Sequence, residues 1–241
     1  MAILIGDLDP LVLYKELSRT DLTSSKIIEA ENQLTHLYEH NLILGAKCLR
    51  LPTALLSSEN LSFEYYEIIC NIALGKARQA AANKDVLVAG VISQPKIKLD
   101  YYDYYKELIV LLDDLGVDFL LLDKFNDLKL AQQAILLALK LSNLSLAVFY
   151  ETNSSQTLGA KELDFLGALA DDYQLELIGL SGDITAINQL KRLPTSSPKG
   201  IILNGINSAE VDLRGINSIY GGSLKRSQWQ TFTTNNLINV D

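Results

Sequence analysis

Apolar and polar positions alternate along the chain in two different patterns. Short apolar runs such as VLVAGV (86–91), DFLLLDK (118–124) and LELIGLS (175–181) are typical of buried strands. Longer stretches such as YYDYYKELIVLLDDLG (101–116) and DLKLAQQAILLALKLS (127–142) follow them and carry apolar residues at the helical period. Because both faces of a parallel sheet are covered, its strands are nearly continuous apolar runs. The pattern therefore indicates parallel strands that alternate with helices.

Strand and helix patterns recur along the whole chain. The strand candidates are 2–7, 47–51, 86–91, 118–124, 146–150, 175–181, 200–206 and 216–222. The helix candidates are 24–46, 62–84, 101–116, 127–142, 160–173 and 183–193. Eight strands in 241 residues predict an α/β protein, a single (β/α)8 TIM barrel over 1–241, with the last helix short or missing. An open doubly wound sheet is the alternative, but IGDLDP (5–10) lacks the glycine fingerprint of a dinucleotide-binding turn.

Charge and composition narrow the class of partner. The net charge of −8 disfavours nucleic acid and anionic membrane surfaces. No apolar run reaches the roughly 18 residues of a membrane span, and the N-terminus lacks the basic start of a signal peptide. Cys48 and Cys70 lie in apolar surroundings without metal or redox spacing, which is typical of a reducing compartment. We expect a cytoplasmic protein, monomeric or homo-oligomeric, whose partner is a small-molecule ligand or another protein.

A barrel places functional groups at the carboxyl ends of its strands. The polar residues at these positions are Asp7, Thr53, Ser93, Asp123, Glu151, Ser181, Asn204 and Ser223. Barrels also bind phosphate between the loops after strands seven and eight. The residues that would serve an anion there are Gly205, Gly221, Gly222, Ser223, Lys225 and Arg226.

Two other clusters are interpreted as structural. His36 and His40 are spaced i, i+4 but lie opposite the apolar stripe of their helix, and no third ligand accompanies them. The tyrosine-rich start of the helix at 101–105 is interpreted as packing rather than a ligand platform.

Several strand ends resemble those of the homocysteine S-methyltransferases. The matching stretches are ILGAKCLRLPT (43–53), GVISQPK (90–96), GVDFLLLDKFNDLKLAQQAI (116–135), LIGLSGD (177–183) and GINSAE (205–210), in the family's order over nearly the whole chain. The resemblance implies the same barrel. Members of the family that this chain resembles hold zinc through three cysteine thiolates, one after strand six and two after strand eight. A zinc-bound thiol loses its proton at neutral pH and becomes the nucleophile for methyl transfer.

At the positions that match the family's zinc ligands, this chain has no cysteine. The residues there are Gly182, Ser223 and Leu224, so the resemblance implies a lost zinc site and no metal cofactor. Asp123 and Lys124 match the family's Glu-Thr pair, whose carboxylate takes the substrate's amino group. The remaining candidate ligand positions are Asp7, Ser181 and Asn207, together with Gly221, Gly222, Lys225 and Arg226.

Three functional hypotheses follow. The first is a homocysteine S-methyltransferase-like barrel of methionine metabolism that has lost its zinc, a pseudoenzyme or repurposed subunit that binds a small molecule or a partner protein. The second is a metal-independent enzyme or binder that acts on a phosphorylated or carboxylated metabolite through the loops after strands seven and eight. The third is an atypical homocysteine S-methyltransferase.

Overall fold

The computed structural model describes residues 3–5, 24–43, 45–53, 63–82, 84–95, 101–152, 157–203 and 213–220. The strands are β1 (Ile3–Ile5), β2 (Cys48–Arg50), β3 (Leu87–Ser93), β4 (Phe119–Phe125), β5 (Ser145–Glu151), β6 (Leu177–Gly182), β7 (Lys199–Leu203) and β8 (Ser218–Tyr220). The helices are α2 (Ser24–Ile43), α3 (Phe63–Ala80), α4 (Tyr101–Leu115), α5 (Leu128–Leu141), α6 (Ala160–Asp172) and α7 (Ile184–Arg192). Each strand and helix predicted from the hydrophobic pattern has its counterpart here.

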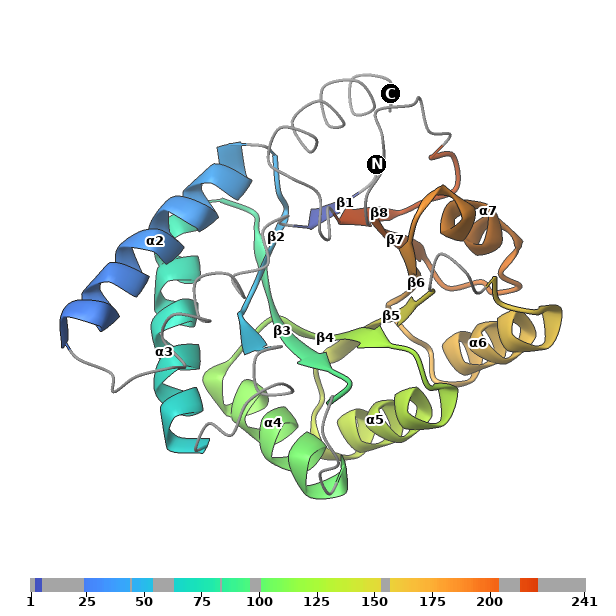
Figure 1. The fold of residues 1–241 in the computed structure, drawn as a ribbon, viewed down its shortest axis with the longest axis horizontal. Coiled ribbons are helices and arrows are strands. Elements are labelled where there is room, and N and C mark those ends of the chain that lie inside the picture. The colour runs from blue at the N-terminus through green and yellow to red at the C-terminus, as the bar shows by residue number, and fades with distance from the viewer. Residues whose placement is uncertain are drawn as a thin grey trace.

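The strands are parallel and follow one another around the sheet in chain order. β1 pairs with β2 through one register pair, Ile5 with Cys48, and with β8 through three. In Figure 1 the curled sheet is seen end-on, with the helices outside it. The α/β class and the TIM-like architecture are therefore confirmed. The predicted weakness of the last helix concerns residues 204–212 and 221–241, which lie outside the described residues.

Local signals explain where the helices begin and end. Asp127 caps α5, because its carboxylate accepts hydrogen bonds from Lys129 N at 2.8 Å and Leu130 N at 3.2 Å. Asp183 caps α7 in the same way through Thr185 N at 2.8 Å. α4 ends at Leu115 and is followed by Gly116, whose φ of 73° lies in the left-handed region that glycine adopts without strain.

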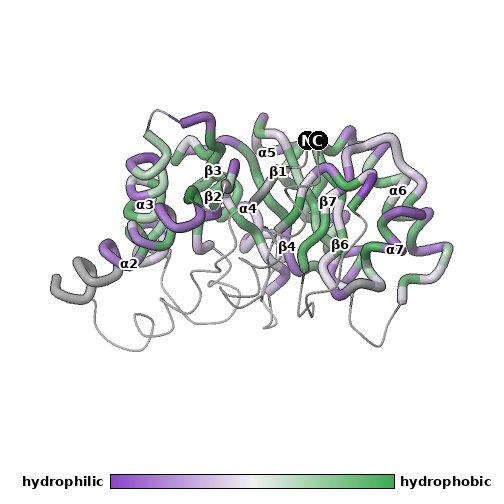
Figure 2. Tube along the Cα trace, turned by 90° about the horizontal axis from the view of Figure 1, so that it is seen from above, coloured by the Kyte–Doolittle hydropathy of each residue, from purple (hydrophilic) through white to green (hydrophobic). Residues whose placement is uncertain are grey.

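Successive side chains on the strands enter two separate apolar clusters. One cluster combines strand residues with helix residues and lies between sheet and helices. The other contains strand residues alone and lies inside the barrel: Cys48, Ala89, Val91, Leu121, Ala147, Phe149, Leu177 and Ile202. Figure 2 shows largely hydrophobic strands such as β7 beside helices in which hydrophobic and hydrophilic residues alternate. This pattern is what a sheet buried on both faces requires.

Phe149 fills the inside of the barrel against two glycines. A Cβ at Gly179 would lie far inside contact distance of the Phe149 ring and 2.7 Å from Gly200 O. A Cβ at Gly200 would lie 2.7 Å from Phe149 Cζ and 2.6 Å from Ser218 Oγ. Both strands must therefore carry glycine where they face this ring.

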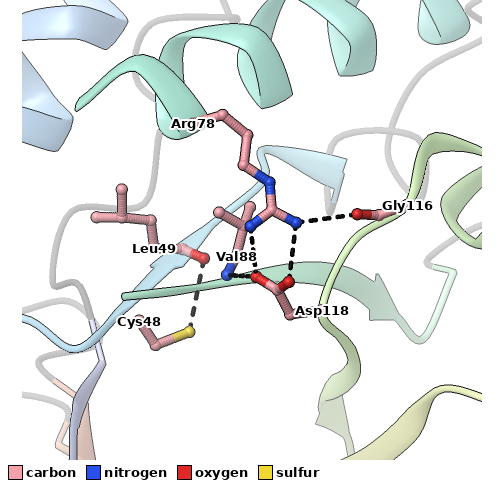
Figure 3. A network of polar contacts seen from close by, with 6 residues as sticks. All are labelled: Cys48, Leu49, Arg78, Val88, Gly116 and Asp118. Carbon is pink, nitrogen blue, oxygen red and sulfur yellow. Dashed lines mark hydrogen bonds and ion pairs between the residues drawn. The ribbon is translucent and has the colours of Figure 1, made fainter. Parts of the chain in front are cut away.

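An arginine joins α3 to the amino-terminal ends of β3 and β4 (Figure 3). Arg78 donates two hydrogen bonds of 2.8 Å to Asp118 and one of 3.0 Å to Gly116 O. Asp118 also accepts a 2.6 Å hydrogen bond from Val88 N. This network lies at the end of the barrel opposite the carboxyl ends of the strands, where side chains serve stability rather than chemistry.

Substitution of Gly179 tests the packing of Phe149. We expect Gly179→Ala to lower the free energy of unfolding by about 1–3 kcal/mol, because the added methyl group overpacks the ring. Phe149→Leu should relieve part of this loss, so that the double variant is more stable than the two single losses added together. Urea unfolding of the four proteins measures the coupling.

Gly75→Ala is the matched control, since a Cβ at that position in α3 meets nothing within 4 Å. It should raise stability by about 0.5–1 kcal/mol, the gain from alanine in a helix interior. Additive losses for Gly179→Ala and Phe149→Leu would contradict the packing.

Candidate functional site

Polar side chains replace apolar ones on the inner face as the strands reach their carboxyl ends. Side chains two positions apart on a strand lie on the same face of the sheet. On each strand from β2 to β6, the last side chain on the face that points into the barrel is polar. These residues, here called the polar layer, are Arg50, Ser93, Asp123, Glu151 and Ser181. The register pairs Ser93 with Asp123 across β3 and β4, and Glu151 with Ser181 across β5 and β6. The structure therefore brings the predicted residues Ser93, Asp123, Glu151 and Ser181 to one end of the barrel.

Arg50 and Asp123 form a buried ion pair within the polar layer. Arg50 Nη2 donates a hydrogen bond to Asp123 Oδ2, which joins β2 to β4 across the inner side of β3. Arg50 is 6% exposed and Asp123 is fully buried. Desolvation of a single buried charge is costly, so each of these groups depends on the other.

Asp123 and its register neighbour Ser93 each carry a buried polar atom that has no hydrogen-bond partner among the residues that the structure describes. These atoms are Asp123 Oδ1 and Ser93 Oγ. Ser93 is 3% exposed and is the register neighbour of Asp123. Buried polar atoms are paired in the great majority of native structures. An unpaired acceptor beside an unpaired hydroxyl is therefore the arrangement expected where a ligand or an ordered water completes the site.

Thr53, a predicted candidate, has a structural role. Its hydroxyl donates to Val91 O and accepts a 2.8 Å hydrogen bond from Val91 N, which extends the pairing of β2 with β3. Tyr66 OH donates to Thr53 O at 3.4 Å. Because the Thr53 hydroxyl already serves backbone groups in both directions, we do not assign it to a ligand.

The turn after β4 is fixed by its neighbours. Lys124 has a φ of 60°, and the register of β4 with β5 shifts between Leu122 and Phe125. Gln94 Oε1 accepts hydrogen bonds from Asn126 N at 3.0 Å and Asp127 N at 3.2 Å. Tyr150 OH donates to Asn126 O at 2.6 Å. The bulge thus lies within β4 directly after Asp123, and these hydrogen bonds hold the carboxyl end of the strand in place.

Gly182 does not face the polar layer. The inner residue at the end of β6 is Ser181, so a side chain at 182 would point to the other face of the sheet. A Cβ there would overlap Thr152 Oγ1 and lie 2.9 Å from Ala186 Cβ at the start of α7. The position that matches the family's first zinc cysteine is therefore closed by packing. Within the described ranges, no group of three or more His, Cys, Asp or Glu side chains has a metal-binding arrangement.

Several predicted ligand residues lie outside the described residues. They are Asp7, Asn204, Gly205, Asn207, Gly221, Gly222, Ser223, Leu224, Lys225 and Arg226. The anion site after strands seven and eight, and the second and third zinc positions, therefore stay predictions. Ser181 is described and is buried, and its carbonyl accepts 2.7 and 2.9 Å hydrogen bonds from Thr152 N and Oγ1.

Arg50 is the residue of the candidate site that the sequence pattern did not reveal. The signal was Arg50 between Leu49 and Leu51, inside the run KCLRL (47–51) that was interpreted only as a strand. A cation in a buried strand requires a counter-ion, and the rule that buried charges are paired would have prompted a search for one.

The other clusters are structural. His36 is 84% exposed and lies 4.0 Å from Glu39, as expected for a surface residue. Tyr105 is fully buried, with its ring centroid 6.0 Å from that of Phe125 and 5.2 Å from that of Tyr104. The packing interpretation of this tyrosine cluster is thereby confirmed for Tyr105. No helix within the described ranges is long and apolar enough to cross a membrane.

Solved structures share this fold, whereas sequence comparisons find nothing. No protein-family model matches the chain, and no curated protein matches it. The apo form of the homocysteine methyltransferase MmuM from Escherichia coli has a TM-score of 0.72 at 17% identity, covering 98% of this chain and 96% of that chain. Its metallated form has a TM-score of 0.68 at 14% identity, with 98% and 96% covered.

A more distant relative in fold is 2,3-dimethylmalate lyase, a member of the PEP mutase/isocitrate lyase superfamily. Its TM-score is 0.50 at 16% identity, covering 77% of this chain and 69% of that chain. At such identities the likeness shows the fold alone, a TIM-barrel fold of the kind that enzymes use.

The two cysteines are expected to be unreactive in the folded protein. Burial raises the pKa of Cys48 to about 12 and that of Cys70 to about 12, so both thiols stay protonated at pH 8. We expect neither to react with Ellman's reagent in the native state and both to react in denaturant. Rapid labelling of Cys48 in the folded protein would show that the inside of the barrel is open to solvent.

Proposed function

We propose that this chain is a single-domain (β/α)8 barrel of the homocysteine S-methyltransferase type that binds a small molecule at the carboxyl ends of its strands, without zinc-thiolate chemistry. The observation that carries the proposal is the buried Arg50–Asp123 pair. Its Asp123 Oδ1 has no partner among the described residues, and Ser93 is its register neighbour. In barrels of this kind, ligands bind at this end. The fold shared with MmuM, and the family's motifs in the same order along the sequence, support the scaffold type.

The surroundings of Gly182 support the part of the proposal that concerns zinc. A cysteine side chain at this position would need the space that Thr152 and Ala186 fill. It would also lie on the opposite face of the sheet from Asp123. Three converging thiolates are the minimum for an open catalytic zinc site of the cysteine type. We therefore rank an atypical homocysteine S-methyltransferase last.

A metal-independent activity on a phosphorylated or carboxylated metabolite is the second candidate. It is favoured by the presence of 2,3-dimethylmalate lyase among the relatives in fold. In this alternative Asp123 and Ser93 act beside the substrate, and Lys225 and Arg226 hold its anionic group.

A ligand screen with two aspartate variants tests the proposed site. We expect a compound from a panel of amino acids, thiols, and phosphorylated or carboxylated metabolites to raise the Tm of the wild type in a thermal-shift assay. Asp123→Asn should remove most of that shift, since the loss of a hydrogen bond to a charged group costs about 1.5–3 kcal/mol.

Asp118→Asn is the matched control at the opposite end of the barrel, where Arg78 pairs with the same type of carboxylate. It should lower the Tm of the free protein but leave the ligand-induced shift unchanged. A shift that survives Asp123→Asn, or the absence of any shift across the panel, would contradict the proposed site.

Gly182→Cys tests the closed position directly. We expect it to lower the free energy of unfolding by about 1–3 kcal/mol, because a side chain there overpacks Thr152 and Ala186. Added zinc should not restore the loss, and Gly182→Ala should show a similar loss because it adds the same Cβ. A rise in Tm with zinc for Gly182→Cys, but not for Gly182→Ala, would show that the position faces the metal site after all.

A further inference from the structure

Arg50 is the counter-ion of Asp123 within the barrel. It begins on β2 and reaches Asp123 on β4 along the inner face, so both charged groups lie on the side that carries the proposed ligand site. Asp123 is fully buried, and its other oxygen has no hydrogen-bond partner within the part of the chain that the structure describes. The charge of the carboxylate is thus neutralised from within the chain, while one of its acceptor sites stays unused.

The buried ion pair determines how strongly the site attracts a further cation. A fully buried carboxylate attracts one cation strongly, because little solvent screens it. Once the guanidinium of Arg50 is in place, a second cation gains little from the carboxylate and meets the positive charge of Arg50 at short range. A neutral hydroxyl or amide N–H meets no such repulsion and can still donate to Asp123 Oδ1, with Ser93 Oγ beside it.

We propose that Arg50 sets the charge class of the ligand: it acts as a built-in counter-ion of Asp123, so that the polar layer accepts neutral hydrogen-bond donors and excludes ammonium and guanidinium groups. The inference rests on the proposed ligand site and names the chemistry of what binds there. It assigns to Arg50 a role in specificity that a residue serving only to stabilise the barrel would not have.

Chemical rescue of Arg50→Ala tests the proposal. The variant leaves Asp123 buried without its counter-ion, and its Tm should fall by about 10 °C, the usual consequence of removing one member of a buried pair. Guanidinium chloride at low millimolar concentration should then raise the Tm by about 3–6 °C once its concentration is ten times its Kd. Methylammonium should also stabilise the variant, whereas the wild type should respond to neither cation.

Two comparisons make the rescue specific. Urea has the planar shape of guanidinium but no charge, so it should not raise the Tm of Arg50→Ala at the same concentration, and neither should sodium chloride. The double variant Arg50→Ala, Asp123→Asn should lose the response to guanidinium, because the acceptor charge is gone. Equal responses to urea and guanidinium, or a response that persists in the double variant, would overturn the proposal.

Refolding yield provides a second measurement if Arg50→Ala does not fold alone. Recovery with guanidinium but not with urea supports the proposal, and recovery with neither overturns it. The rescue needs no natural ligand, so its failure leaves the result of the ligand screen intact. Conversely, a wild type that binds nothing in the screen contradicts the proposed site even where rescue succeeds.

Discussion

The packing of Phe149 against Gly179 and Gly200 is the constraint on which the rest of the site depends. A parallel barrel must fill its own interior to the density of a protein core. Here the ring of Phe149 on β5 fills the space beside β6 and β7. This is possible only because Gly179 and Gly200 on those two strands have no Cβ. The polar layer therefore follows an apolar filling rather than a water-filled channel. Charges in that layer act in a medium of low dielectric constant, where their interactions are strong.

Two arginine–aspartate ion pairs lie at opposite ends of the barrel, and their different burial gives them different roles. Arg78 and Asp118 are 42% and 27% exposed by side chain, so solvent screens this pair even though its geometry is bidentate. The pair fixes α3 and β3 relative to the start of β4, because Arg78 and Val88 N both donate to the carboxylate of Asp118. Arg50 and Asp123 are buried, and the loss of either would leave an uncompensated charge inside the protein. The exposed pair organises the scaffold, and the buried pair defines the electrostatics of the candidate site.

The sequence predicts this architecture well because local rules determine its elements. Apolar runs gave the strands, the helical period gave the helices, and Gly116 marked the end of α4. Asp123 was found as a candidate because it is the polar residue at the end of an apolar strand. Arg50 was missed because its partner lies 73 positions away, and no local pattern pairs two residues so distant. The room that Gly179 and Gly200 provide for Phe149 is equally non-local, since it exists only once three strands lie side by side.

Gly182 shows why a family motif alone does not place a side chain. A shift of one residue along a strand moves a side chain to the opposite face of the sheet, so a correct position in the sequence still leaves the direction open. Here Ser181 is the residue on the inner face, and Gly182 lies against Thr152 and Ala186.

The fold shared with the homocysteine methyltransferase MmuM does not by itself determine the chemistry, which depends on which strand-end side chains point inward. Those side chains include one cation and one carboxylate that neutralise each other, with a carboxylate oxygen and a hydroxyl that have no partner among the described residues. In the proposed site these two atoms select ligands by the donors that the ligands present, and Arg50 sets the charge class. In the proposed site, recognition depends on the geometry of Asp123 and Ser93, which the bulge at Lys124 and the register of β3 with β4 hold fixed.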